Sequence, residues 1–264
     1  MDIGGERGGL DPDEPDERLD PPDEQDIRWD GFVAEMTAEA PSELALGVPR
    51  QLCEACVRLL PVTGGSLSLA DGAGRTRVTL CATDEVAARL AEIQYTLGEG
   101  PCRYASEMRA PVSAVDLTGG RDARRWPVFA HQAVEAGAGS AFSFPMSQSG
   151  SVLGTVDLYN TGPSSLGEAD IRLGLRAADA VAMVLAAVHH GQGDETQPGV
   201  GWWTQAEANH EEVYQATGML MVRLGVSADE AMARLRARAF VLNRTITDVA
   251  KDVTNRRDDP RSGD

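Results

Sequence analysis

The chain has 264 residues, of which 42% are apolar, and a formal net charge of -17. This length and apolar content suit a globular protein with one or two buried cores. No apolar run reaches the roughly 18 residues of a membrane span, and the N-terminus has no signal-peptide pattern, so we expect a cytoplasmic protein with no membrane partner. The four cysteines are too few for a secreted disulfide framework. So acidic a chain excludes a protein that coats nucleic acid with its whole surface, and polyanion binding would need a local basic patch.

The first forty residues hold most of the acidic excess, with fourteen Asp and Glu side chains against three arginines. The run LDPDEPDERLDPPDEQD in this segment is rich in proline and almost free of apolar side chains. Such a segment buries too little surface to offset the entropy that ordering costs, so we predict a disordered acidic tail over residues 1–30. Its role stays open between a solubilising tail and a phosphate mimic that folds back on a basic segment.

The next part of the chain alternates between helical and strand patterns. The expected elements are a helix over 44–60, strands at 66–70 and 77–82, a helix over 84–95, a strand over 110–117, a helix over 124–136, and strands at 140–146 and 152–160. Two pairs of strands are joined by short turns, which indicates hairpins. Because the strands come as hairpins with helices between them, we predict an α+β domain built on an antiparallel sheet.

A long helix is predicted over residues 168–190, where two apolar stripes run side by side. The first has the spacing of a heptad seam, with Ile171, Leu175, Ala178, Ala182, Leu185 and His189. The second consists of Ala177, Val181, Val184 and Val188. Together they are wide enough to cover the sheet and to meet a symmetry mate, so we expect a homodimer. The alternative is that both stripes are ordinary core of one domain.

The remaining residues predict a bundle of three amphipathic helices. The first helix ends at Gly225, and the second and third begin with the capping patterns Ser227-x-x-Glu230 and Thr245-x-x-Asp248. The expected boundaries are a first domain over 41–190, a linker over 191–203, the helical domain over 204–257 and a disordered tail over 258–264.

A basic island, RLRARAF at residues 234–240, lies on the second helix of this bundle. Arg234 and Arg238 share a face that points away from Leu235 and Ala239, so we expect them to face solvent and to reach phosphate. The alternative is a solvated helix face, because nine basic and ten acidic side chains nearly cancel from residue 205 onward. Phe240, the last residue of the island, is expected in the core, because an aromatic side chain at helical spacing is usually buried there. The alternative is that its ring is a platform for RNA.

The stretch VYQATGMLMVRLGVSADEAMARLRARAF, followed by DVAKDV, resembles the ANTAR domain, the three-helix RNA-binding module of bacterial transcription antiterminators. The runs Q-A-x-G-x-L-M, G-x-S-x-x-E-A and L-R-x-x-A-F occur in the order and at the distances of that family, from about residue 205 to residue 257. The preceding domain resembles a GAF domain in its LGEGPC, APVSAVDL, RWPVFA and LGTVDLYN stretches. This combination is similar to the GAF-ANTAR proteins common in actinobacteria.

The resemblance implies an antiparallel-sheet sensor domain followed by a bundle that binds paired hairpins in leader RNA, so that a terminator cannot form. Arginine contacts phosphate and stacks on unpaired bases, which adds to this expectation. The candidate RNA contacts are Arg223, Arg234, Arg236, Arg238, Arg244 and Lys251. The alternative function is a ligand- or redox-responsive regulatory dimer that acts through protein partners. DNA binding is disfavoured, because the turn between the second and third helices does not resemble a helix-turn-helix.

The signal that the first domain would sense is not apparent from the sequence. The Asn-Lys, Phe, Asp-Glu motif of cyclic-nucleotide-binding GAF domains has no counterpart, which disfavours cyclic GMP. The LGEGPC loop either closes a small-molecule pocket, with Glu99, Cys102 and Trp126 as candidate lining residues, or only lets the chain turn. Cys102, expected in a loop, is also a candidate redox thiol, whereas Cys53 and Cys56 are expected in the core.

Catalytic and metal sites are not expected in this chain. The sequence has no Gly-rich phosphate loop and no G-x-S-x-G elbow, so we expect no enzyme. The histidines do not cluster, and the two cysteines one helical turn apart have no further ligands at metal spacing, so we assign no metal.

Overall fold

The computed structural model describes residues 24–37, 47–70, 77–148, 150–191 and 210–255. Its centre is a five-stranded antiparallel sheet in the order β2-β1-β5-β4-β3. The strands are β1 (Gly64–Ala70), β2 (Arg77–Ala82), β3 (Val112–Ala114), β4 (Ser140–Gln148) and β5 (Ser151–Asn160). The antiparallel α+β domain predicted from the sequence is therefore confirmed.

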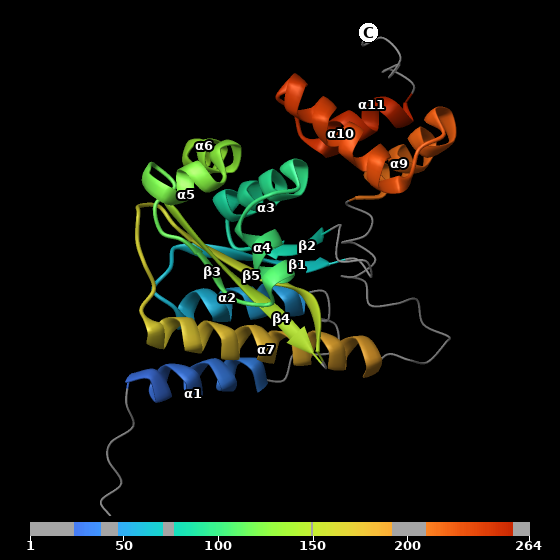
Figure 1. The fold of residues 1–264 in the computed structure, drawn as a ribbon. Coiled ribbons are helices and arrows are strands. Elements are labelled where there is room, and N and C mark those ends of the chain that lie inside the picture. The colour runs from blue at the N-terminus through green and yellow to red at the C-terminus, as the bar shows by residue number, and fades with distance from the viewer. Residues whose placement is uncertain (1–23, 38–46, 71–76, 149, 192–209, 256–264) are drawn as a thin grey trace, which may run out of the picture.

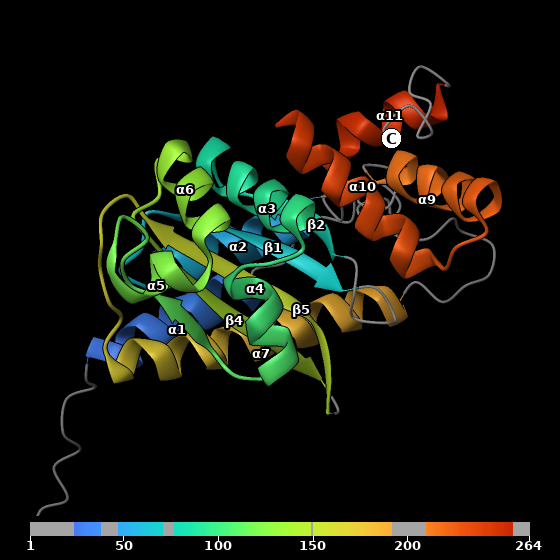
Figure 2. The same ribbon diagram turned by 45° about the horizontal axis from the view of Figure 1, so that its top comes forward.

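Helices cover both faces of this sheet (Figure 1). On one face lie α1 (Glu24–Thr37), α2 (Val48–Leu59) and α7 (Glu168–Gly191). On the other lie α3 (Glu85–Leu97), α4 (Pro101–Met108), α5 (Gly120–Arg125) and α6 (Pro127–Ala136). The C-terminal bundle consists of α9 (Glu211–Leu224), α10 (Ala228–Leu242) and α11 (Ile246–Thr254), and it lies next to α3 (Figure 2).

Two apolar cores hold the sheet between its helices. Leu67, Phe144 and Val156 are buried against α2 and α7, and Gly174 lets α7 approach closely, since a Cβ there would lie 2.6 Å from the Phe144 ring. The core on the opposite face is built around Phe129, with side chains from α3, α5 and α6. Burial of large apolar side chains on both faces fixes the sheet in one register.

Both apolar stripes of α7 point into the chain's own core over their described side chains. Ala178, Ala182 and Leu185 of the predicted seam are buried, as are Ala177 and Val181 of the second stripe. The remaining side chains of the helix end beyond residue 187 lie outside the described part. The alternative interpretation, ordinary core of one domain, accounts for these residues, and the homodimer stays a prediction.

Residues 24–30 are helical in α1, so the predicted disordered tail is wrong for this part. Phe32 is buried on α7 and α2, and the Arg28 guanidinium donates to the Leu59 carbonyl oxygen and pairs with Asp170 at 3.1 Å. Arg176 of α7 lies 4.0 Å from the Trp29 ring centroid. These aromatic anchors stabilise the helix despite the acidic composition upstream. Residues 1–23 lie outside the described residues.

Three local predictions need adjustment. Cys102 lies in the first turn of α4 and not in a loop, because Pro101 opens a helix at its first position. The predicted helix over 124–136 is two helices, since Pro127 starts a new one after Trp126. The third strand is shorter than predicted, because backbone N–H groups donate to the Asp116 side chain and turn the chain there.

The helical bundle forms with the predicted caps. Ser227 Oγ accepts the Glu230 N–H at 3.2 Å, and Thr245 Oγ1 accepts the Asp248 N–H at 3.1 Å. Gly225 ends α9 in the left-handed conformation at φ 66°. The predicted linker over 191–203 lies outside the described residues except for residue 191. The predicted tail over 258–264 lies wholly outside them.

Candidate functional site

Helix α10 separates an apolar face from a basic one. Leu235 and Ala239 are buried against α9 and α11. Arg234 lies on the opposite side, 51% exposed, where its guanidinium pairs with Glu230 at 2.7 Å. Arg238, one turn further on, is half-buried. An exposed pair contributes little stability, so a phosphate group can displace Glu230 from Arg234 at low cost.

Arg236 lies on another side of α10 and contacts the sensor domain. Two positions along a helix correspond to a rotation of about 200°, so Arg236 points away from Arg234. Its Nε donates to the Tyr95 carbonyl oxygen of α3 at 3.4 Å, and a Cβ added to Gly98 would lie 2.8 Å from its Cζ. Burial lowers the pKa of this guanidinium. The basic island is therefore not one continuous patch, and Arg236 is not part of the open surface around Arg234.

The other candidate contacts surround the ends of the bundle helices. Arg244, between α10 and α11, bonds Asp252 at 2.5 Å and the Asp248 carbonyl oxygen at 3.2 Å. Lys251 on α11 and Arg223 near the end of α9 are exposed. The pairing of Arg244 is internal to the bundle and fixes the turn before α11, so this residue has a structural role as well as a positive charge.

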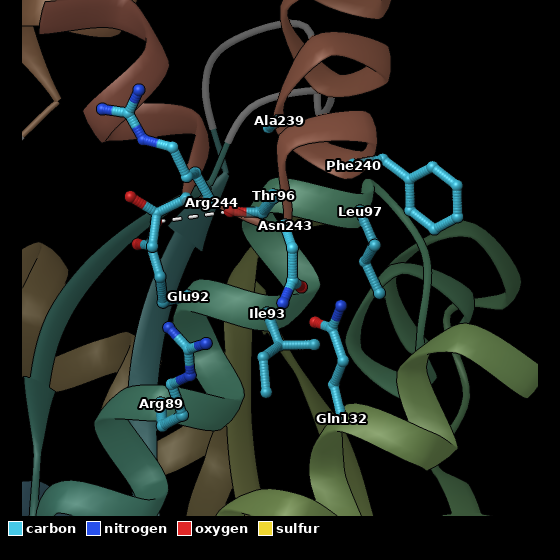
Figure 3. Close-up of a pocket in the computed structure, with 11 residues that line it drawn as sticks. Arg89, Glu92, Ile93, Thr96, Leu97, Gln132, Ala239, Phe240, Asn243 and Arg244 are labelled. Atoms are coloured by element: carbon cyan, nitrogen blue, oxygen red, sulfur yellow. Dashed lines mark hydrogen bonds between the residues drawn. The ribbon is translucent and has the colours of Figure 1, made fainter.

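A crevice lies between the sensor domain and the bundle, where α3 and α6 face the end of α10 (Figure 3). Figure 3 shows the side chains of Gln132 and Asn243 pointing toward each other across it, with the Phe240 ring to one side. Phe240 is 56% exposed, so the expectation that it is core is wrong. The crevice is lined by Arg89, Glu92, Ile93, Thr96, Leu97, Gln132, Ala239, Phe240, Asn243, Arg244 and Thr245.

A hydrogen-bonded chain crosses this junction. The Thr96 hydroxyl of α3 accepts the Ile246 N–H of α11 at 3.2 Å and donates to Glu92 Oε1 at 3.3 Å. Burial raises the pKa of Glu92. The Ile246 N–H is a donor of the first turn of α11 that no carbonyl of that helix can accept, so the sensor domain caps a helix of the bundle.

A second, interior cavity lies between α3 and the sheet. Its floor includes Asp157, whose carboxylate accepts the Ser143 hydroxyl at 2.6 Å and the Thr155 hydroxyl at 2.8 Å. Its volume of about 10 Å³ is close to what one water molecule needs. The lining residues are Ser66, Ala87, Leu90, Gln94, Phe129, Ala141, Ser143, Asp157, Leu158 and Tyr159.

None of the three predicted pocket residues lines this cavity. Cys102 is buried, and its backbone N–H donates at 2.9 Å to Oε1 of Gln94, an α3 residue that lines the cavity. Trp126 is buried against the Tyr104 ring, and its Nε1 has no hydrogen-bond partner among the described residues. Glu99 is half-buried after the end of α3. A redox thiol needs access to solvent, so the burial of Cys102 argues against that role.

Sequence reasoning missed the polar floor of the cavity. Asp157 stands at a buried position of β5, opposite Ser66 and Ser143 of the neighbouring strands, and a carboxylate in the middle of a predicted strand is the signal that could have identified it. Cys53 and Cys56 are buried in the core as predicted, and burial raises the pKa of Cys56 to about 12. Among the described helices, none combines the length and apolar character needed to cross a membrane.

The geometry is that of an antiparallel α+β domain with a small polar interior cavity, joined to a three-helix bundle with exposed basic side chains. The chain matches the model of the GAF domain over residues 48–186, which is more than half of its length, and it belongs to that family. Residues 204–253 match the model of the ANTAR domain. Both resemblances inferred from the sequence are thereby confirmed, and the pairing is that of a signal-responsive regulator.

Solved structures similar to this chain include other GAF domains. The GAF domain from Acinetobacter phosphoenolpyruvate-protein phosphotransferase covers 65% of this chain and 98% of its own, at 12% identity and a TM-score of 0.49. The corresponding GAF domain from Coxiella burnetii covers 63% and 95%, at 16% identity and a TM-score of 0.48. Free methionine-R-sulfoxide reductase from Neisseria meningitidis covers 65% and 95%, at 13% identity and a TM-score of 0.45. None of the curated proteins compared with this chain matches it.

Proposed function

We propose that this chain is a signal-responsive RNA-binding regulator of transcription antitermination. The GAF domain senses a small molecule, and the ANTAR bundle binds hairpins in leader RNA so that a terminator does not form. The observation that carries the proposal is the exposed Arg234 on α10, within a bundle that matches the ANTAR domain model. The expectation that the chain is not an enzyme belongs to the same proposal.

Phosphate contacts come from exposed basic side chains of the bundle. Arg234 is exposed on α10 and paired with Glu230, and Lys251 is exposed on α11. Arginine suits this task, because its planar guanidinium binds phosphate through two hydrogen bonds at once. Neutralising phosphates releases counterions, so this binding weakens as salt rises.

The regulator acts as a homodimer on paired hairpins. Two linked bundles engage two hairpins with a higher effective concentration than one bundle does, so the distance between the bundles controls affinity. The signal acts on that distance through the packing along α7. Sedimentation and a comparison of single-hairpin with double-hairpin RNA test this part, and a monomer that binds both RNAs equally would contradict it.

The small molecule enters the interior cavity beneath α3. The buried Asp157 carboxylate and the Gln94 amide give this cavity polar groups that a ligand can meet on entry. Since the closed cavity holds about one water, entry of any larger ligand displaces α3.

The test is a titration of the full chain against a two-hairpin leader RNA. An Arg234→Ala, Arg238→Ala double variant should bind more weakly, and its salt slope should become shallower by about 1 for each phosphate group that it no longer neutralises. Arg172→Ala is the matched control, because Arg172 is an exposed arginine of α7 with a similar pairing to Glu168. Equal affinities of the double variant and the control would contradict the proposal.

A second candidate function is a ligand-responsive dimer that acts through protein partners. Val222, Phe240 and Val241 of the bundle are 87%, 56% and 74% exposed, and exposed apolar side chains of this size are typical of protein interfaces. A protein interface of this kind depends little on salt. A bundle that binds no RNA at any salt concentration, but is captured by a partner through these residues, would favour this function.

A further inference from the structure

The bundle borrows part of its core from the sensor domain. Tyr95 of α3 is 5% exposed within the apolar core of the bundle, and its ring lies 4.3 Å from the ring of His210, the N-cap of α9. The Thr96 hydroxyl accepts the Ile246 N–H at the start of α11. Helix α3 therefore packs on the bundle as a fourth helix, with α10 running beside it (Figure 2).

Two arginines meet the C-terminal end of α3. The last carbonyl groups of a helix have no partner within it and carry partial negative charge. Arg103 Nη1 donates to the Gly98 carbonyl oxygen at 2.8 Å, and Arg236 Nε donates to the Tyr95 carbonyl oxygen at 3.4 Å. Gly98 ends α3 in the left-handed conformation at φ 66°, and the absence of a side chain there leaves room for the Arg236 guanidinium.

We infer that the C-terminal end of α3 is a docking site for the arginine-bearing helix of the bundle and competes with RNA phosphate for Arg236. This inference rests on the proposed RNA-binding function. A helix end offers carbonyl oxygens where RNA offers phosphate oxygens, and the Arg236 guanidinium, half-buried against Tyr95 and Gly98, is shielded from a phosphate while the bundle is docked. RNA binding with the full set of arginines therefore requires the bundle to leave α3.

The same helix connects this docking site to the interior cavity. Ala87, Leu90 and Gln94 on one side of α3 line the cavity, whereas Tyr95 and Thr96 hold the bundle. Gln94 and Tyr95 are adjacent, so a displacement of α3 that opens the cavity also moves the carbonyl group that Arg236 bonds. Occupation of the cavity and release of the bundle are thus two consequences of one movement.

The test compares three variants of the full chain. Tyr95→Ala removes the anchor in the bundle core, and Thr96→Val keeps the side-chain shape but removes the acceptor for the Ile246 N–H. Tyr104→Ala is the matched control, since this tyrosine packs on Trp126 within the sensor domain. Each protein is titrated with two-hairpin leader RNA, and each is labelled with phenylglyoxal, which modifies accessible guanidinium groups, with Arg234 as the internal reference.

In the unchanged chain and in Tyr104→Ala, Arg236 should react with phenylglyoxal more slowly than Arg234. In Tyr95→Ala and Thr96→Val, the two arginines should react at similar rates. If the undocked bundle is about a tenth of the population, RNA affinity should rise about tenfold in Tyr95→Ala, and by less in Thr96→Val. Equal labelling of Arg236 and Arg234 in the unchanged chain would overturn the docking site. Faster labelling of Arg236 with unchanged RNA affinity would overturn the competition while leaving RNA binding intact. Absence of RNA binding in every variant, with Arg236 released, would instead refute the proposed function, and the competition with it.

Discussion

The two sides of α10 carry the same residue type in different environments. Arg234 is exposed and, among the described residues, pairs with Glu230 one turn away, whereas Arg236 is half-buried against the carbonyl end of α3. The first is available to a polyanion, and the second is engaged by the sensor domain. A run of arginines in a sequence is therefore not a surface patch in itself, because helical rotation assigns its members to different partners.

The largest expected effect comes from breaking the core that holds both sides of α10 in place. Leu235→Ala should lower the free energy of unfolding of the bundle by about 2 to 5 kcal/mol, because it leaves a cavity between α9 and α11. Val241→Ala on the same helix is the control, since Val241 is 74% exposed, and it should change that free energy by less than about 0.5 kcal/mol. Urea unfolding, monitored through hydrogen exchange of the α10 amides, measures the free energy of unfolding of both variants.

A smaller effect separates the two arginines directly. Arg236→Ala should destabilise the bundle in the full chain by about 1 kcal/mol, because it leaves the Tyr95 carbonyl without this donor. Arg234→Ala should cost less than about 0.5 kcal/mol, since it removes only an exposed ion pair. Hydrogen exchange of the amides of α10 and α11 gives both values. Equal destabilisation by the two variants would contradict the claim that the two arginines differ in their environments.

The smallest expected effect is a pH dependence at the junction. Burial lowers the pKa of His210 below its ordinary value of 6.5, so its contribution is complete above about pH 6.5 and is lost as the pH falls toward the lowered pKa. The neighbouring Glu212 opposes the downward shift, and Glu92 across the junction, whose pKa is raised by burial, favours the folded state on acidification. His210→Phe keeps the ring on Tyr95 without the titration.

Thermal unfolding at pH 7.5 and pH 5.5 compares these two proteins. The unchanged chain should lose more stability than His210→Phe between the two pH values, by about 1 kcal/mol or less. Because Glu92 is present in both proteins, its opposite contribution cancels in the comparison. An identical decrease in the two proteins would show that His210 does not titrate in this range.

The sequence predicted what local rules determine. Apolar periodicity and turn residues predicted the hairpins of the sheet, and the capping residues Ser227 and Thr245 predicted where two bundle helices begin. The acidic, proline-rich composition upstream concealed α1, whose Trp29 and Phe32 hold it on α7. Composition averages over a window, whereas two aromatic contacts are enough to anchor a helix.

The candidate site was predicted only in part, because its residues meet through tertiary contacts. Periodicity shows that a helix has an apolar face, but it does not name the partner, so the packing of Tyr95 into the bundle could not be read from the pattern. The exposure of Phe240 could not be predicted for the same reason, since its position on α10 is compatible with a core residue and with a surface residue. Asp157 lay within a stretch identified from the family resemblance, yet its place beneath α3 depends on strand pairing.

The most direct measurement for the central claim is the salt dependence of binding between the full chain and a two-hairpin leader RNA. If Arg234, Arg238, Arg244 and Lys251 each contact one phosphate, the logarithm of the binding constant should fall with the logarithm of salt concentration with a slope of about −3 to −4 for each bundle. A slope near zero, or no binding across the salt range in the chain and in Tyr95→Ala alike, would contradict RNA recognition by this bundle.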